Sequence, residues 1–326
     1  MNSLTKKTLK NSRSLTYTYY VSPAKSPLPT VLLIHGCPDS ASLWADLITT
    51  HLQPSGYGVV AVDDLGYAGS SKPTDSASYA MNLMTNDLCE ILDAENLDQI
   101  IPLGHDWGSI LTARLYNFHP ERVKGLVTLN TAYVPPRGQP FHLDEMNAMM
   151  TQRIGYGPFW YWYLFTSEEG PKILDTHVES FFTALHGDPA TWMDIFCKKD
   201  GLKNYLLENR KQDVLQYATS EMREAFVKRM TEDGFTAPML WYKAMAENRD
   251  VEAEKVLHET SVVKVPLLFI AATKDLLGPP AAIQGPAQMG LLPDLTINEI
   301  DAGHWSMLAK PQEVGESLTK WLKSKF

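Results

Sequence analysis

Residues 104–108, Gly-His-Asp-Trp-Gly, form the stretch of this sequence that is best suited to chemistry. They follow a short apolar run at 99–103 and precede a run with helical spacing at 110–115. Two glycines that bracket one reactive side chain between a strand and a helix are typical of a nucleophile elbow, a tight turn whose two ends accept only small residues. The turn lifts its central side chain above the sheet, and here that side chain is Asp106.

An aspartate at the centre of the elbow, where serine is more usual, restricts the reaction. A carboxylate is ionised at neutral pH, so Asp106 needs no base before it attacks carbon. Attack on an acyl carbon would give a mixed anhydride, which is unproductive for ester or amide hydrolysis. Attack on a saturated carbon that carries a leaving oxygen or halide gives an ordinary ester, which water can cleave. The alternative is a non-catalytic turn in which Asp106 only caps the helix.

Three further groups of polar residues follow apolar runs in the same manner. Because ligands of a parallel sheet bind beyond the carboxyl ends of its strands, these groups are expected to meet Asp106 at one edge. Each group alone is more typical of a turn, a cap or a buried polar residue, but their joint occurrence at strand ends indicates a catalytic site. The groups are residues 35–38 (His-Gly-Cys-Pro), Asp275 and His304.

Alternating apolar runs and helical patterns predict the elements that position these residues. Runs that are apolar throughout are expected as strands buried on both faces of a sheet, and runs with helical spacing separate them. Strands that alternate with helices form parallel βαβ units, so the sequence predicts an α/β fold with a doubly wound, mostly parallel sheet. Strands are expected at residues 30–34, 58–62, 99–103, 123–129, 265–271 and 295–300, with an antiparallel edge strand at 15–21, and helices at 41–52, 81–92, 110–118 and 314–322.

The alternation stops at residues 135–255, which contain no run typical of a buried strand and are rich in Met and aromatic residues. We predict that this segment is a helical lid inserted over the strand ends. The core domain would then comprise residues 1–134 and 256–326. The apolar composition of the lid predicts an apolar pocket and a hydrophobic substrate.

The chain of 326 residues carries a net charge of −9, which disfavours nucleic acid or an anionic membrane surface as a partner. Its three cysteines include no Cys-x-x-Cys pair and predict a reducing compartment, hence the cytoplasm. The C-terminal Ser324-Lys325-Phe326 is close to the peroxisomal Ser-Lys-Leu signal, which leaves peroxisomal import as an alternative. The sequence shows no signal peptide, membrane-spanning run or metal motif, and no cofactor is expected.

Taken together, these motifs resemble the soluble epoxide hydrolases of the α/β-hydrolase fold. The resemblance covers nearly the whole chain and is weakest in the lid. In chain order, Asp106, Asp275 and His304 match the nucleophile, acid and histidine of that fold. The motifs that carry the resemblance are residues 35–38, 66–71 (Gly-Tyr-Ala-Gly-Ser-Ser), 104–108 and 303–305 (Gly-His-Trp).

The resemblance implies a role for each of these residues. Asp106 would attack an epoxide carbon to give an alkyl-enzyme ester, and His304 would activate the water that cleaves it. Asp275 would hold the His304 ring and stabilise its charged form. The backbone N–H groups of Cys37 and Trp107 would form the oxyanion hole, in which one donor typically contributes about 3–4 kcal/mol.

The resemblance also implies two lid tyrosines that protonate the epoxide oxygen. Tyr242 lies in a Met-Leu-Trp-Tyr-Lys stretch, although Leu240 replaces the usual Asn, and Tyr161 precedes Phe165 by four residues. Tyr163 is an alternative to Tyr161, and simple packing of the lid is the alternative for the whole aromatic cluster. The substrate-binding surface is expected to include Tyr163, Trp107, His35 and Pro38.

Two other functions fit parts of the pattern. A haloalkane dehalogenase would use the same Asp–His pair, but Cys37 replaces the Asn common in those enzymes, and no carboxylate follows the strand at 123–129. A non-catalytic hydrolase-fold receptor for a small apolar molecule would often lack a member of the triad, and none is missing. A serine esterase would need Ser109 as its nucleophile, and Ser109 lacks the flanking glycines.

Overall fold

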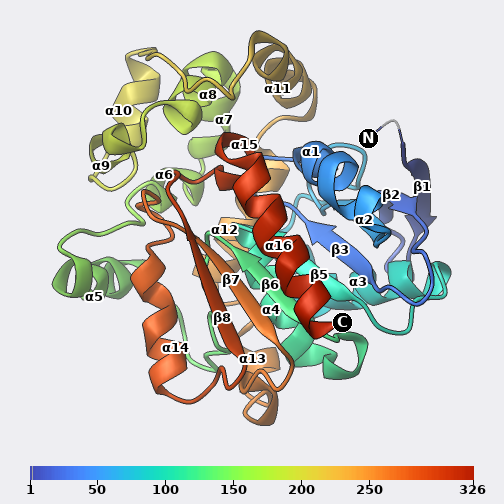
Figure 1. Cartoon of the computed structure of the whole chain (residues 1–326). Helices are drawn as coiled ribbons and strands as arrows, with labels where there is room; N and C mark the ends of the chain where they lie inside the picture. The colour runs from blue at the N-terminus through green and yellow to red at the C-terminus, as the bar shows by residue number, and fades with distance from the viewer. Residues whose placement is uncertain (2) are drawn as a thin grey trace.

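The computed structural model describes residue 1 and residues 3–326. In this part of the chain, eight strands form one sheet in the order β1-β2-β4-β3-β5-β6-β7-β8 (Figure 1). The strands are β1 (Thr5–Lys10), β2 (Thr16–Ser22), β3 (Thr30–Ile34), β4 (Gly58–Asp63), β5 (Ile101–His105), β6 (Leu126–Leu129), β7 (Leu267–Ala272) and β8 (Leu295–Ile300).

The parallel part of the sheet confirms the predicted doubly wound arrangement. Strands β3 to β8 pair in parallel, and every residue of β3, β4, β5, β6 and β7 is buried, as their uninterrupted apolar runs require. Strand β8 lies at the edge and is only half-buried.

The prediction that residues 15–21 form an edge strand was wrong about the position of the strand in the sheet. The strand exists as β2 and is antiparallel, but it lies inside the sheet between β1 and β4. The true edge is β1, an exposed strand with three lysines that has no apolar alternation to reveal it. Lysines on an edge strand discourage pairing with a second sheet.

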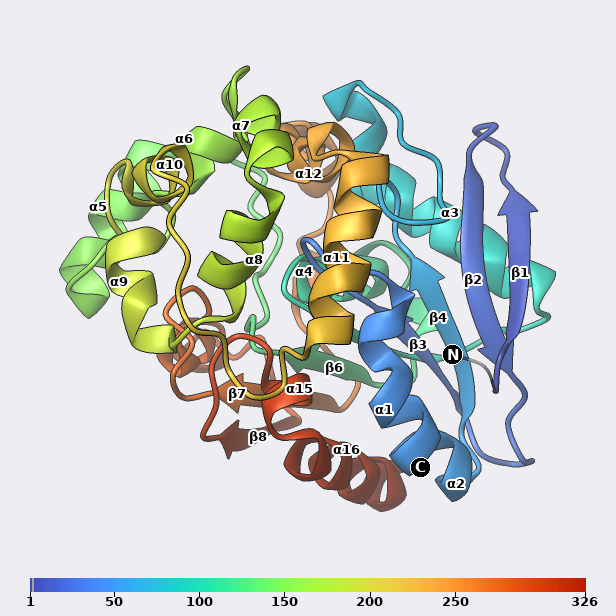
Figure 2. The same cartoon turned by 90° about the horizontal axis from the view of Figure 1, so that it is seen from above.

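Helices cover both faces of the sheet. Helices α1, α2 and α16 lie on one face, and α3 and α4 on the other (Figure 2). The predicted helix at 41–52 is present and continues to Ser55, with residues Ile48–Leu52 wound as a π-helix between α1 and α2. The core helices are α1 (Ala45–Leu47), α2 (Gln53–Ser55), α3 (Met81–Ala94), α4 (Trp107–Phe118), α14 (Gln284–Gln288), α15 (Ser306–Ala309) and α16 (Pro311–Lys325).

The segment between β6 and β7 is helical, as the break in the strand pattern predicted, and most of it lies over the carboxyl ends of the strands (Figure 1). We call residues 135–255 the lid, although these boundaries stay a prediction. Helix α12 is anchored to the core because Trp241 Nε1 donates to the carbonyl of Leu65 at 2.8 Å. The lid helices are α5 (Leu143–Ile154), α6 (Trp162–Phe165), α7 (Gly170–Thr176), α8 (Val178–His186), α9 (Trp192–Ile195), α10 (Gly201–Leu207), α11 (Ser220–Asp233), α12 (Thr236–Ala246) and α13 (Val251–Glu254).

The three cysteines, Cys37, Cys89 and Cys197, are buried and unpaired. Among the residues that the structure describes, no helix is long and apolar enough to cross a membrane.

Candidate active site

Asp106 stands at the junction of β5 and α4 in a conformation that L-amino acids rarely adopt. Its φ is 54° and its ψ is −122°, while β5 ends at His105 and α4 begins at Trp107. A Cβ on Gly104 would lie 2.0 Å from the carbonyl oxygen of Gly108, and one on Gly108 would lie 2.2 Å from that of Ile34. Both glycines are therefore sterically required, and the strained turn places Asp106 above the sheet as an elbow does.

The Asp106 carboxylate receives backbone hydrogen bonds from two sides. The N–H of Cys37 donates to Asp106 Oδ1 at 2.9 Å. The neighbouring residue must be glycine for the loop to approach this closely, because a Cβ on Gly36 would lie 2.4 Å from Asp106 Cβ. Burial raises the pKa of Asp106, while the charge of His304 and the N–H groups of Trp107 and Cys37 act in the opposite direction. The two N–H groups thus converge on the carboxyl group and can stabilise an anion that forms on it.

His304 joins Asp106 to Asp275. Its Nε2 lies 3.7 Å from Asp106 Oδ2, and its Nδ1 donates to Asp275 Oδ2 at 2.7 Å. Burial alone would lower the pKa of His304, but the carboxylates, Asp275 foremost, raise it to about 9. Burial opposes ionisation of Asp275, yet the imidazole holds the pKa of this carboxyl below its usual range. The ring is therefore fixed with Nε2 toward Asp106.

Asn130 completes this arrangement, and the sequence analysis did not assign it a role. Its Nδ2 donates to Asp275 Oδ2 at 3.1 Å and to the carbonyl of His304 at 2.7 Å, and its Oδ1 accepts from Ser306 Oγ at 2.7 Å. It follows β6 directly and has a φ of 66°. The sequence does contain a signal for Asn130, because the residue directly follows a buried strand. At that position the sequence analysis had looked only for a carboxylate.

Two further histidines near the elbow are structural. His35 Nδ1 donates to the carbonyl of Gly36 at 2.8 Å, and its Nε2 accepts the N–H of Asp64 at 3.0 Å. Burial lowers the pKa of His35 to about 3, so the ring is neutral, and only 1% of the residue is exposed. The expectation that His35 belongs to the substrate-binding surface is not supported, because both its nitrogens hold backbone groups. His105 similarly donates from Nε2 to the carbonyl of His304 at 2.8 Å.

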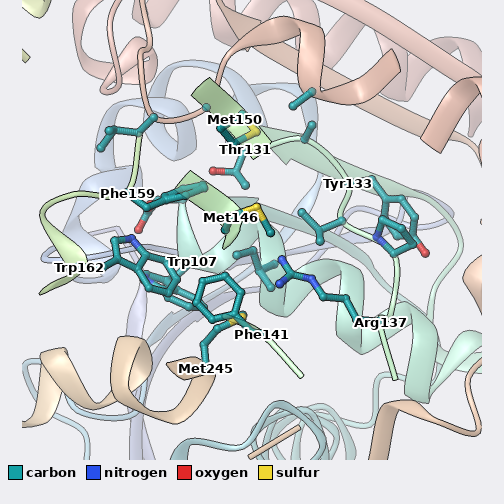
Figure 3. Close-up of a pocket in the computed structure, with 18 of the residues that line it drawn as sticks. Trp107, Thr131, Tyr133, Arg137, Phe141, Met146, Met150, Phe159, Trp162 and Met245 are labelled. Atoms are coloured by element: carbon teal, nitrogen blue, oxygen red, sulfur yellow. The ribbon is translucent and has the colours of Figure 1, made fainter. Parts of the chain in front are cut away.

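A cavity of about 370 Å³ opens between the sheet and the lid. Asp106, Trp107, Tyr161 and His304 contribute to its wall, and much of the remainder is aromatic or Met (Figure 3). On the other side of Asp106 is a small chamber of about 20 Å³. Its wall includes Cys37, Pro38 and Tyr242, together with Asp106, Tyr161 and His304 from the larger cavity.

Tyr161 and Tyr242 lie together beside the nucleophile. Their rings make an edge-to-face contact with centroids 6.0 Å apart, and Tyr242 makes a similar contact with Trp107 at 5.1 Å. Both side chains are buried, and burial together with the neighbouring charge of Asp106 raises the pKa of each phenol. Both phenols therefore stay protonated at neutral pH and can donate a hydrogen bond.

Tyr163 does not join them. It is 37% exposed, its hydroxyl donates to Asp144, and its ring stacks on Trp160 at 5.4 Å. Of the two candidates for the second phenol, only Tyr161 faces Asp106.

The lid also contacts the loop that carries the Cys37 N–H, through an arginine that no motif had marked. Arg229 of α11 donates to the carbonyls of Pro38 at 2.7 Å and Asp39 at 3.1 Å. Asp39 in turn accepts a hydrogen bond from Trp305 Nε1 at 3.0 Å, next to His304. The loop of Cys37, Pro38 and Asp39 is thus held by Arg229 from the lid and by Trp305 from the segment that carries His304.

Comparison with known proteins agrees with this geometry. Residues 29–311 match the family defined by the alpha/beta hydrolase fold. The chain is 28% identical over 305 residues to bifunctional epoxide hydrolase 2 of Rattus norvegicus, which covers 91% of this chain and 52% of the rat protein. It is 27% identical over 312 residues to epoxide hydrolase A of Mycobacterium tuberculosis, with 90% of each chain covered. The chain spans about half the length of the mammalian relatives that it matches.

Solved structures show the same fold. An epoxide hydrolase from an endophytic Streptomyces superposes with a TM-score of 0.82 at 24% identity, over 99% of this chain and 96% of that one. Epoxide hydrolase A from Mycobacterium thermoresistibile gives a TM-score of 0.80 at 23% identity, with 98% of each chain covered.

Proposed function

We propose that this chain, which belongs to the alpha/beta hydrolase fold family and is similar to known epoxide hydrolases, converts a hydrophobic epoxide and water into a vicinal diol. The observation that carries the proposal is the pair of buried phenols, Tyr161 and Tyr242, beside a nucleophilic Asp106. An epoxide oxygen must be protonated as its ring opens, whereas a departing halide needs no proton.

In the first step, a carboxylate oxygen of Asp106 attacks one epoxide carbon. The carbon–oxygen bond of the ring breaks, and the oxygen takes a proton from one of the two phenols, Tyr161 or Tyr242, while the other donates a hydrogen bond. The phenol that gives its proton is left as a phenolate. No atom leaves, so the product is an ester of Asp106 that carries the whole substrate with a new hydroxyl group. The aromatic wall of the cavity binds the substrate with its epoxide ring next to Asp106 and excludes water from the nucleophile.

The ester changes the charge next to His304. In the free enzyme the carboxylates, including Asp106, hold the pKa of His304 at about 9, so its ring is protonated at neutral pH. Esterification removes the Asp106 charge, and the pKa of His304 therefore falls. The Nε2 proton can then pass to the phenolate left by ring opening, and the neutral ring becomes a base for water only after the ester has formed.

In the second step, His304 takes a proton from a water molecule, which attacks the carbonyl carbon of the Asp106 ester. The tetrahedral oxyanion is stabilised by the N–H groups of Cys37 and Trp107, and Asp275 stabilises the imidazolium. Collapse of the intermediate breaks the bond between the carbonyl carbon and the ester oxygen. The departing alkoxide takes the proton of the new carboxyl group, so the diol and the Asp106 carboxylate form and His304 is again protonated. The thiol of Cys37 takes no part, because burial raises its pKa to about 12.

The experiment that tests the proposal compares matched panels of epoxides and haloalkanes. We expect diol formation from aryl-substituted or alkyl-substituted terminal epoxides and no halide release from haloalkanes of the same size. Halide release without diol formation would instead support a dehalogenase with the same Asp–His pair. Binding of both panels without any turnover would support a receptor.

We predict that Tyr242→Phe slows formation of the Asp106 ester by about 100-fold, the lower end of the range for loss of a general acid, because Tyr161 remains. The rate of ester hydrolysis should change little, since the phenol acts only on the epoxide oxygen. Rapid quenching and mass spectrometry of the ester in single turnovers measure the two rates separately.

The matched control is Tyr163→Phe, which removes a hydroxyl from the outer side of the same lid segment. It should leave both rates unaltered. Equal ester-formation rates in Tyr242→Phe and the wild type would remove Tyr242 from the mechanism.

We also predict that Arg229→Ala slows ester hydrolysis by about tenfold. Arg229 is a positioning residue: it fixes the loop whose Cys37 N–H belongs to the oxyanion hole, and loss of such a donor outright typically costs 100-fold to 1000-fold. Arg229→Lys should recover part of the rate, because a lysine can still donate to the carbonyl of Pro38. Arg223→Ala on the same helix, whose side chain pairs with Glu179 instead, should retain the wild-type rate. An equal loss in both alanine variants would indicate a general effect on the lid.

A further inference from the structure

The two cavities beside Asp106 differ greatly in size. The large one has a volume of about 370 Å³, and the small chamber has a volume of about 20 Å³. Asp106, Tyr161 and His304 belong to the walls of both, whereas Tyr242 belongs to the wall of the chamber. An epoxide ring held between Asp106 and the two phenols therefore lies at the boundary, with one ring carbon toward each cavity.

The wall of the chamber that faces away from the large cavity is apolar. Helix α8 contributes Phe181 and Leu185, and α9 with the residue that follows it contributes Trp192 and Phe196. Residues four positions apart lie on the same face of a helix, so each pair places two apolar side chains against the chamber. All four residues are buried, with at most 7% of any of them exposed.

This wall is held by contacts that leave little freedom to move. Trp192 Nε1 donates to the carbonyl of Ala184 at 3.1 Å, and the Trp192 ring lies 4.7 Å from that of Phe196 between centroids. Phe181 makes an edge-to-face contact with Phe165 at 6.0 Å. Because side chains in a packed interior interdigitate, a bulky group could enter the chamber only by displacing these rings.

The volume of the chamber limits what a substrate can place there. A void needs roughly 10–15 Å³ to hold one water molecule, so about 20 Å³ admits one group of about that size. A hydrogen or a methyl group on the ring carbon that faces the chamber fits this space, whereas an ethyl or phenyl group exceeds it. The larger substituent of the epoxide must then lie in the large cavity.

We propose that Leu185 and the aromatic rings around it are specificity-determining residues, and that they restrict the substrate to epoxides in which one ring carbon carries only hydrogen or a methyl group. This inference rests on the proposed epoxide hydrolysis and deepens it, because it states which substitution patterns are accepted. Leu185 is the sharpest test position, since it also lines a second void of about 10 Å³ beside Leu215 and Tyr217. A shorter side chain at Leu185 should join this void to the chamber.

The test uses trans epoxides that keep a phenyl group on one ring carbon and carry hydrogen, methyl, ethyl or phenyl on the other. In the wild type, we expect kcat/KM for the hydrogen and methyl members to agree within about tenfold. From methyl to ethyl it should fall by roughly 10-fold to 200-fold, the range for one methylene in an apolar pocket, and the diphenyl member should not react. The rate of ester formation in single turnovers should show the same selectivity, because the limit acts before Asp106 attacks.

In Leu185→Ala the methyl-to-ethyl ratio of kcat/KM should fall to about one, because the truncated side chain leaves space for the additional carbon. Leu185→Met conserves the side-chain volume and should keep the wild-type ratio. Ile195→Ala is the matched control: Ile195 lies on α9 and is as well buried, at 6% exposed, but it is not among the residues that line the chamber. It should also keep the wild-type ratio.

Three results would overturn the size limit while leaving epoxide hydrolysis intact. The first is a wild type that hydrolyses the ethyl and diphenyl members as fast as the methyl member. The second is an unchanged ratio in Leu185→Ala, and the third is an equal fall in Ile195→Ala, which would show only a general loosening of the lid. Failure of the wild type to hydrolyse any member of the series, the hydrogen member included, would contradict the proposed function itself.

Discussion

Asp106→Ala is expected to abolish diol formation, with a fall in kcat of about 10⁴-fold or more, as is typical when a nucleophile is removed. The side chain is the only group at the elbow that can form the ester, and the N–H groups of Cys37 and Trp107 then have no carbonyl to act on. The fold should persist, because an alanine avoids burying a charge and the flanking glycines keep the turn. Turnover of an epoxide by the purified variant measures the loss, and circular dichroism checks the fold.

A matched control is Asp46→Ala, which removes an exposed carboxylate from α1. It should retain wild-type turnover. If Asp106→Ala retained even a tenth of the wild-type rate, the assigned nucleophile would be incorrect. Ser109, the alternative at the elbow, does not compete, since its hydroxyl is buried and donates to the carbonyls of Gly104 at 2.6 Å and Leu129 at 3.1 Å.

His304→Gln is expected to form the Asp106 ester but to hydrolyse it about 1000-fold more slowly, within the range for loss of a general base. Asp106 attacks as a carboxylate and needs no base, whereas the water that cleaves the ester does. Incubation with epoxide should therefore leave one covalent adduct for each chain. Mass spectrometry of the peptide that contains Asp106 should show the full mass of the substrate, because ring opening loses no atom.

The adduct also separates the candidate functions. A dehalogenase would leave an alkyl group that lacks the halogen, and a receptor would form no adduct. An adduct on any residue other than Asp106 would contradict the mechanism.

The sequence predicted the centre of the site because its chemistry is local. The elbow needs two glycines for steric reasons that hold in any such turn, and a buried parallel strand needs a continuous apolar run. Asp275 and His304 could be placed beside Asp106 because each follows a strand, and the carboxyl ends of parallel strands share one edge.

The supporting residues could not be predicted because they act through contacts between distant segments. Asn130 bonds to Asp275 across 145 positions, and Arg229 bonds to Pro38 across 191. An asparagine after a strand or an arginine on a polar helix is common, so neither type of residue is a signal by itself.

The choice between Tyr161 and Tyr163 shows the same limit. The two lie two positions apart, and an aromatic run offers no apolar–polar alternation that could tell the inner side from the outer. Their different environments follow from the short helix α6, which begins at Trp162 and turns Tyr163 toward Asp144. The exposed strand β1 was missed for a related reason, since Leu9 is its one apolar residue and gives no alternation.

The central claim is that water attacks the ester of Asp106 and never the epoxide itself. A single turnover with excess enzyme in water labelled with the heavy oxygen isotope tests it most directly. We predict that the label appears in the carboxyl group of Asp106 and that the diol of this first turnover carries unlabelled oxygen taken from the enzyme. A labelled diol together with an unlabelled Asp106 would show direct attack by water on the epoxide and would contradict the mechanism.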